Sequence, residues 1–188
     1  RGWFKIMKAI IFAGGCFWGV EAYFKRLNGV METVVGYIDG YTENPTYKEV
    51  CAGSGHAEAV RIAYDEAKIS LETLLDHFFR IVNPTEKDRQ GPDIGRQYRN
   101  GIFLLSPSDM EKTQNYVNIL KDKYIDPIQT IVKMAPVFYE AEAYHQDYLD
   151  KVPNGYCHIN LNLASNSEMK EEYRHEDQSR GQKRHQKK

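Results

Sequence analysis

The chain turns from strand to helix within residues 8–19, which read KAIIFAGGCFWG. Residues 8–13 are a nearly continuous apolar run, which is typical of a strand buried on both faces. Two glycines then permit a sharp turn, and Cys16 follows them at the start of an amphipathic helix over about residues 18–27. This order predicts a thiol in the first helical turn after a buried strand.

Such a position has consequences for the chemistry of Cys16. The unpaired N–H groups and the positive dipole end of a helix N-terminus stabilise an anion, and they lower a cysteine pKa from ~8.5 into the range of about 3.5–7.5. We therefore expect Cys16 to be a thiolate nucleophile, with Phe17 and Trp18 walling an apolar pocket beside the sulfur. Taken alone, the motif also suits a small cysteine packed in a core.

The apolar patterns on either side of this turn predict the fold class. Strands are expected over residues 32–38, 57–64 and 102–105, and helices over residues 70–82 and 106–124. With the first strand and helix, the order is strand, helix, strand, strand, helix, strand, as in the ferredoxin-like unit. The sequence predicts an α+β two-layer sandwich with a ferredoxin-like βαββαβ core.

The other segments are predicted more coarsely. Residues 39–51 and 83–101 indicate loops, and the second is long enough to suggest a functional purpose. Residues 129–140 are expected to be extended, residues 144–151 to form a short helix, and residues 156–161 to form an additional strand.

The domain organisation follows from length and composition. A chain of 188 residues suits one domain, expected over residues 8–163. Residues 1–7 are interpreted as a leader or a remnant of recombinant expression ahead of a native start. Residues 164–188 are polar and charged, without an apolar stripe, and are expected to form an appendage.

Charge and cysteine content exclude several classes of function. A formal net charge of −1 argues against a nucleic-acid partner, and no apolar run approaches the ~20 residues of a membrane span. The three cysteines lack CxxC spacing, so neither a disulfide scaffold nor a metal site is expected. The composition predicts a protein of the reducing cytoplasm.

Glu58 is the candidate acid that could act together with the Cys16 thiol. Strand alternation over residues 57–64 places Glu58 on the same face as Val60, Ile62 and Tyr64. Because burial raises a carboxyl pKa, Glu58 could stay protonated near neutral pH and act as a general acid. An alternative of equal weight is that Glu58 pairs with a buried arginine or accepts a hydrogen bond from a backbone amine. Its neighbour His56 is interpreted as a packing or hydrogen-bonding residue.

Six blocks in order resemble the methionine sulfoxide reductase A family, the peptide-methionine (S)-S-oxide reductases. They cover about residues 8–160: GGCFWG (14–19), NPTY with VC (44–47 and 50–51), GHAEAV (55–60), RQGPD (89–93), QYR (97–99) and GYC (155–157). The resemblance implies reduction of methionine S-sulfoxide, free or in oxidised proteins. Cys16 would attack the sulfoxide sulfur and Glu58 would protonate its oxygen, leaving a sulfenic acid on Cys16.

The resemblance also implies roles for the other site residues. Phe17 and Trp18 would hold the substrate methyl group, and Tyr47, Asp93 and Tyr98 would orient the sulfoxide oxygen. No bound cofactor or metal is implied. The electrons would come from outside, usually from thioredoxin, through a disulfide between Cys16 and a second cysteine.

The second cysteine is where this chain departs from many members of the family. Cys157 matches the family's Gly-Tyr-Cys position and is the candidate resolving residue, but it lies in a stretch without the glycines of a mobile tail. The alternative is a one-cysteine enzyme whose sulfenic acid is reduced by glutaredoxin, glutathione or another thiol such as dithiothreitol. Cys51 is interpreted as structural. Some relatives carry selenocysteine at the position of Cys16.

Two other classes of function stay open at this point. A cysteine hydrolase or acyltransferase would need a histidine base for Cys16, either His145 with Asp147 or His158 with Asn160. A non-catalytic ferredoxin-like binding module would use the polar tail as an arm. If such a module bound RNA, a pair of aromatic residues would be expected on its central strands. This pair is missing, and the tail mixes acidic with basic residues.

Overall fold

The computed structural model describes residues 7–175 of the chain. The strands are β1 (Met7–Gly14), β2 (Val30–Ile38), β3 (Ala57–Asp65), β4 (Arg89–Gln90), β5 (Asp93–Ile94), β6 (Asn100–Leu104), β7 (Ile131–Met134) and β8 (Phe138–Glu140). The helices are α1 (Phe17–Lys25), α2 (Tyr47–Cys51), α3 (Leu71–Ile81), α4 (Asp109–Lys121) and α5 (Tyr148–Lys151), with short 3₁₀ turns at Arg96–Tyr98, Ala143–His145, Leu161–Leu163 and Glu171–Tyr173.

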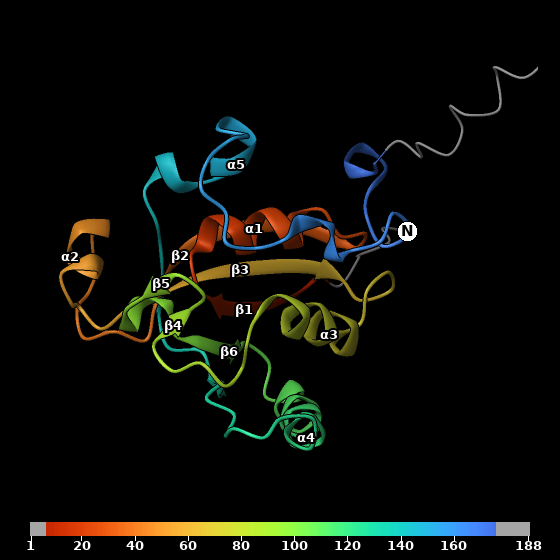
Figure 1. Ribbon diagram of the computed structural model, residues 1–188, viewed down its shortest axis with the longest axis horizontal. Helices are drawn as coiled ribbons and strands as arrows, with labels where there is room; N and C mark the ends of the chain where they lie inside the picture. Colours follow the sequence, from red (N-terminus) through yellow and green to blue (C-terminus); the bar gives the residue numbers. More distant parts are fainter. Residues whose placement is uncertain (1–6, 176–188) are drawn as a thin grey trace, which may run out of the picture.

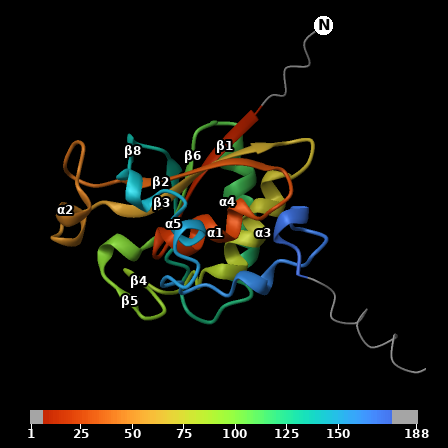
Figure 2. The same ribbon diagram turned by 90° about the horizontal axis from the view of Figure 1, so that it is seen from above.

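The fold is mixed α/β and is built on one six-stranded sheet (Figure 1). The strand order is β7-β6-β1-β3-β2-β8, and all neighbours are antiparallel except β6 and β7. β4 and β5 form a separate small hairpin. In both views α2 and this hairpin lie on the same side of the molecule (Figures 1 and 2).

The main core lies between the sheet and the helices α1, α3 and α4. Phe12 of β1 is central: its ring centroid is 5.0 Å from that of Phe24 on α1 and 4.6 Å from that of Phe78 on α3. All three side chains are fully buried, and each such burial stabilises the fold by about 1.5–3 kcal/mol. A smaller cluster of Ala, Ile and Phe side chains lies on the opposite face of the sheet.

Strand alternation in β3 is confirmed. Val60, Ile62 and Tyr64 belong to the main core, whereas Ala57 and Ala59 belong to the cluster on the other face. Glu58 shares the parity of the first group, so its side chain is directed towards the helices. The register pairs Glu58 with Tyr37 of β2.

Three local predictions are wrong. Residues 83–101 are not loop throughout, because they contain the β4–β5 hairpin, the 3₁₀ turn Arg96–Tyr98 and the first two residues of β6. Residues 39–51 are not loop throughout, because α2 begins at a capping box in which the Thr46 hydroxyl accepts from the Glu49 amide and the Glu49 carboxylate accepts from the Thr46 amide. The expected strand over residues 156–161 is absent. This segment packs on α1 instead of a strand, with Ile159 in the main core, so its alternation reflects contacts with a helix.

The expected appendage is also wrong for residues 164–175, which pack against the core. Met169 is fully buried and forms an isolated bridge with Leu27, and the Asn28 amide donates to the Glu168 carbonyl over 2.9 Å. Arg80 of α3 pairs with the Glu168 carboxylate at 2.9 Å. A buried methionine, backbone hydrogen bonds and an ion pair secure the segment, and none of these contacts requires an apolar stripe.

The rest of the expected appendage, residues 176–188, and residues 1–6 of the expected leader lie outside the described residues. Met7, the last residue of that leader, is the first residue of β1. Over residues 7–175, none of the helices combines the length and the apolar character that a membrane crossing requires.

Candidate active site

The turn that carries Cys16 depends on glycine at two positions. Gly15 has a φ of +90°, and a Cβ there would lie 2.8 Å from both Gln90 Cβ and His158 Nε2. A Cβ on Gly19 would lie 3.2 Å from Cys157 Sγ. The two glycines thus make room for side chains that close over the start of α1, where Cys16 is the N-cap residue.

Glu58 lies at the same helix N-terminus. Its Oε1 accepts a hydrogen bond of 3.2 Å from the amide of Phe17, the residue after Cys16. Glu58 is 2% exposed, and burial raises its pKa from 4.5 to about 8, although the Phe17 N–H acts in the opposite direction. The carboxyl group is therefore protonated at neutral pH, as expected for a general acid.

The thiol of Cys16 differs from the prediction. Burial is the largest cause that raises its pKa above the ordinary range, an ionised Glu58 raises it further, and the amides of Trp18 and Gly19 lower it by less. Cys16 is only 7% exposed, so the loss of water outweighs the helix N-terminus. The expectation of a resting thiolate is wrong, because the helix end was weighed without the burial.

Phe17 and Trp18 both lie in an aromatic cluster that includes His145. The Phe17 ring is buried, with its centroid 5.0 Å from that of His145. The half-buried indole of Trp18 stacks on Tyr148 at 3.8 Å, and its Nε1 donates to His145 Nδ1 over 3.0 Å. The two aromatic residues after Cys16 are thus held by a segment more than 120 residues away.

The three polar candidates come from separate elements. Tyr47 is the first residue of α2, Asp93 begins β5, and Tyr98 ends a 3₁₀ turn. Burial raises the pKa of Tyr98, and the charges of Glu58, Cys16 and Asp93 raise it further. Burial likewise raises the pKa of Tyr47, with smaller contributions from Cys51 and Glu58.

Cys157 lies in a short strap, residues 156–158, that crosses the first turn of α1. The Tyr156 hydroxyl donates to Asp93 over 2.9 Å, and His158 Nε2 lies 3.1 Å from the Gly14 carbonyl oxygen. Between them, Cys157 Sγ donates to the Ile159 carbonyl at 3.2 Å. The half-buried free thiol thus lies next to Gly19, one helical turn from Cys16.

Two residues of the site were missed or misread from the sequence. Glu142 accepts hydrogen bonds from the Tyr37 hydroxyl at 2.8 Å and the Tyr47 amide at 3.0 Å. His145, considered only as a hydrolase base, bonds Trp18 instead. No local pattern marks either residue, because the site partners Tyr37, Tyr47 and Trp18 are distant in the chain.

The remaining cysteine and histidine candidates have other surroundings. Cys51, interpreted as structural, is exposed at the end of α2. His56 is buried, with Nδ1 accepting from the Gly40 amide at 3.1 Å and Nε2 lying 2.8 Å from the Thr42 carbonyl oxygen. Both ring nitrogens of His56 have backbone partners, as expected for a structural histidine.

The pairings that a cysteine hydrolase requires do not form within residues 7–175. The Asp147 carboxylate pairs with Lys25, and Asn160 Oδ1 accepts from the Asn162 amide at 3.0 Å. Neither side chain bonds His145 or His158: His145 Nδ1 accepts from Trp18 and His158 Nε2 lies near the Gly14 carbonyl oxygen. Without such a partner, neither histidine is oriented as a base.

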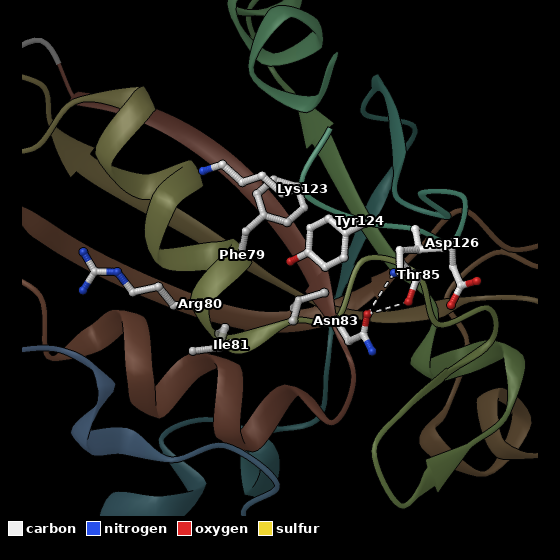
Figure 3. A pocket seen from close by; sticks show the side chains of 10 residues that line it. Phe79, Arg80, Ile81, Asn83, Thr85, Lys123, Tyr124 and Asp126 are labelled. Carbon is white, nitrogen blue, oxygen red and sulfur yellow. Dashed lines mark hydrogen bonds between the residues drawn. The ribbon is translucent and has the colours of Figure 1, made fainter. Parts of the chain in front are cut away.

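A groove at the C-terminal ends of α3 and α4 lies apart from these residues (Figure 3). Phe79, Ile81 and Tyr124 form its apolar part, and Asn83 Oδ1 accepts from the Thr85 amide and hydroxyl. None of the candidate site residues lines this groove. The candidate site residues therefore lie apart from this groove, around the start of α1.

The chain is similar to known proteins over most of its length. A family model described as "Peptide methionine sulfoxide reductase" matches residues 8–177. The peptide methionine sulfoxide reductase MsrA of Alkaliphilus metalliredigens is 52% identical over 158 residues, covering 84% of this chain and 100% of that protein. The MsrA of Clostridium tetani is also 52% identical, covering 84% of this chain and 96% of that protein.

Solved structures are similar over most of the chain. Methionine sulfoxide reductase A of Corynebacterium diphtheriae superposes with a TM-score of 0.76 at 33% identity, covering 88% of this chain and 84% of that one. Reduced Mxr1 of Saccharomyces cerevisiae superposes with a TM-score of 0.75 at 39% identity, covering 80% of this chain and 88% of that one. Together with the geometry around Cys16, these matches establish that the chain belongs to the peptide methionine sulfoxide reductase family, whose members are oxidoreductases acting on methionine sulfoxide.

Proposed function

We propose that the chain reduces methionine S-sulfoxide, free or in oxidised proteins, with Cys16 as nucleophile and Glu58 as general acid. The observation that carries this assignment is the buried Glu58 carboxyl, hydrogen-bonded to the amide next to Cys16 and with a pKa raised to about 8. A protonated acid beside a thiol supplies what sulfoxide reduction requires: a soft nucleophile and a proton for the departing oxygen.

The reaction balances with a neutral thiol in the resting enzyme. Glu58 donates its proton to the sulfoxide oxygen as Cys16 Sγ attacks the sulfoxide sulfur. The thiol proton passes to the Glu58 carboxylate, which restores the acid. The Sγ–S bond formed in this attack and the S–O bond of the substrate then break as the hydroxyl passes to Sγ. Methionine is released and Cys16 becomes a sulfenic acid, so the substrate sulfur is reduced and the cysteine sulfur is oxidised.

The surrounding side chains divide into an apolar and a polar group. We assign Phe17 and Trp18 to the substrate methyl group, because their rings follow directly on Cys16 in α1. We assign Tyr47, Asp93 and Tyr98 to the sulfoxide oxygen. Glu58, Cys16 and Asp93 all contribute to the raised pKa of Tyr98, which supports this grouping.

Recycling of the sulfenic acid has two possible routes. In the first, the Cys157 thiol attacks the Cys16 sulfenic sulfur, which forms a disulfide and releases water, and a dithiol then reduces the disulfide. The contact of Cys157 with Gly19 supports this route. In the second, glutaredoxin, glutathione or dithiothreitol reduces the sulfenic acid directly. This route is supported by the hydrogen bonds of Tyr156 and His158, which fix both ends of the strap 156–158 and restrict the movement of Cys157.

Thioredoxin is the electron donor that we propose for the first route. The S. cerevisiae Mxr1 structure in complex with Trx2 is similar to this chain, with a TM-score of 0.54 at 29% identity. It covers 76% of this chain and 84% of that one. No bound metal or organic cofactor enters the proposed reaction, because the external thiols supply both electrons.

The finer features of the fold and the compartment are also proposals. The order β6-β1-β3-β2 with antiparallel neighbours supports a ferredoxin-like core. We propose a single catalytic domain that includes residues 164–175, because Met169 is buried in the main core. Three free thiols are compatible with the cytoplasm, where disulfides are rare.

Replacing Cys16 by serine tests the assignment. We expect Cys16→Ser to abolish methionine release from a peptide S-sulfoxide with dithiothreitol as reductant, whereas Cys51→Ser keeps it. In the wild type without reductant, each methionine released should be accompanied by the loss of one thiol if the sulfenic acid persists, or of two thiols if Cys157 forms the disulfide. Turnover by Cys16→Ser near the wild-type rate would remove Cys16 from the reaction.

A further inference from the structure

A buried histidine lies behind the aromatic residues that follow Cys16. His145 is 1% exposed, and the ring centroids of Tyr144, Tyr47 and Phe17 lie 4.1, 4.6 and 5.0 Å from its own. Its Nδ1 accepts the indole N–H of Trp18 over 3.0 Å. The mechanism above gives this histidine no part in proton transfer.

The hydrogen bond to Trp18 decides the tautomer of His145. An indole nitrogen only donates, so Nδ1 must carry the lone pair and the proton of the neutral ring lies on Nε2. Nε2 is buried without a hydrogen-bond partner in the described part of the chain. The ring thus leaves one buried N–H unpaired while it presents its acceptor to Trp18, an arrangement that calls for an explanation.

Two contacts from one segment hold the Trp18 indole. His145 binds its N–H edge, and Tyr148 stacks on its face with an interplanar angle of 13°. The segment is itself fixed to α1, since the Asp147 amide donates to Glu21 over 2.7 Å and the Asp147 carboxylate pairs with Lys25. The indole is therefore held in one orientation from two sides.

We propose that His145 is a positioning residue for the sulfoxide substrate, which holds Trp18 in the orientation that receives the methyl group. The inference rests on the proposed role of Trp18 in substrate binding. Since His145 acts through Trp18 and not on the reacting atoms, its loss weakens substrate binding and leaves the chemical step largely intact.

Two variants separate the acceptor from the ring. His145→Phe keeps an aromatic ring but removes the acceptor, and His145→Asn offers Oδ1 where Nδ1 lay. For a peptide methionine sulfoxide we expect His145→Phe to raise KM about 5- to 10-fold with kcat within about twofold, the range of one lost hydrogen bond. We expect His145→Asn to stay closer to wild-type KM. An unchanged KM in His145→Phe, or an equal rise in both variants, overturns the proposal.

A double-mutant cycle tests whether His145 acts through Trp18. In a Trp18→Phe background, which lacks the indole N–H, His145→Phe should raise KM by less than about twofold. A full additional rise in that background would show that His145 affects binding by another route and would overturn the proposal.

A measurement on the unsubstituted site covers the case in which the variants fold poorly. The sequence has two tryptophans, so Trp3→Phe leaves Trp18 as the sole indole. We expect its indole N–H to exchange with solvent at least tenfold more slowly than that of a free tryptophan, and exchange at the free rate overturns the inference. Failure of the proposed function is seen separately, as activity retained by Cys16→Ser.

Discussion

Replacing Glu58 by glutamine should separate stability from catalysis as a function of pH. The folded protein holds the Glu58 carboxyl with a pKa of about 8, against 4.5 for the ordinary group, because the side chain is buried. Between these values the unfolded chain has lost the proton and the folded protein has kept it. The free energy of unfolding therefore falls as pH rises from about 4.5 to about 8.

The size of this effect follows from the two pKa values. Each pH unit in the window lowers the free energy of unfolding by about 1.4 kcal/mol, which amounts to about 3 kcal/mol at pH 7 and about 4 kcal/mol at pH 8. Glutamine keeps an oxygen for the Phe17 amide and does not ionise. Glu58→Gln should thus gain stability relative to the wild type by these amounts, counted from pH 4.5.

Urea unfolding at several pH values between 4 and 9 measures this difference. We expect the wild type and Glu58→Gln to diverge between pH 4.5 and 8 and to run parallel above it. Glu111→Gln, on the exposed surface of α4, is the matched control and should not diverge. Curves for Glu58→Gln and the wild type that stay parallel across the whole range would refute the buried, protonated carboxyl.

Catalysis should change in the opposite sense. Removing a general acid costs about 10²–10⁴-fold, so we expect Glu58→Gln to lose at least 100-fold in single-turnover methionine release at pH 7. The wild-type kcat/KM should fall as pH rises through about 8, where Glu58 loses its proton. A wild-type rate that keeps rising between pH 7 and 9 would indicate that ionisation of the thiol is limiting instead.

Three further changes test other parts of the molecule. Cys157→Ser should leave single-turnover methionine release intact and stop thioredoxin-dependent turnover, with Cys51→Ser as control; surviving turnover favours the one-cysteine route. Met169→Ala should lower the free energy of unfolding in urea by about 2–5 kcal/mol, because the side chain is fully buried, whereas the half-exposed Met31 should tolerate alanine. Gly15→Ala should lower both stability and methionine release, since its φ is +90° and a Cβ would meet neighbours at 2.8 Å; a wild-type melting temperature would contradict this.

Much of the site was predictable because its signals are local. The apolar run before Gly14 and the helical pattern after it placed Cys16 at the start of α1 without any tertiary information. The two-residue period of a strand was enough to direct Glu58 towards the helices. Resemblance to the family supplied the roles of Tyr47, Asp93 and Tyr98, which no pattern of their own indicates.

The elements that were wrongly predicted depend on packing partners far away in the chain. Residues 156–161 alternate like a strand but lie on α1, and residues 164–175 join the core through Met169 although their composition is polar. Local patterns describe which side of a segment is apolar. Local patterns do not show whether that apolar side packs against the edge of a sheet or against a helix.

The chain alone predicted a mixed α/β fold, the place of Cys16 at the start of α1 and the direction of Glu58 towards the helices, because the periods of strands and helices act over a few residues. Only the tertiary structure decided the protonation of Cys16, since its pKa depends on how much water the surrounding side chains remove. It also decided that Trp18 is held by His145, 127 residues away, because that contact exists only after both segments have packed on α1. Burial and long-range hydrogen bonds are properties of the assembled molecule.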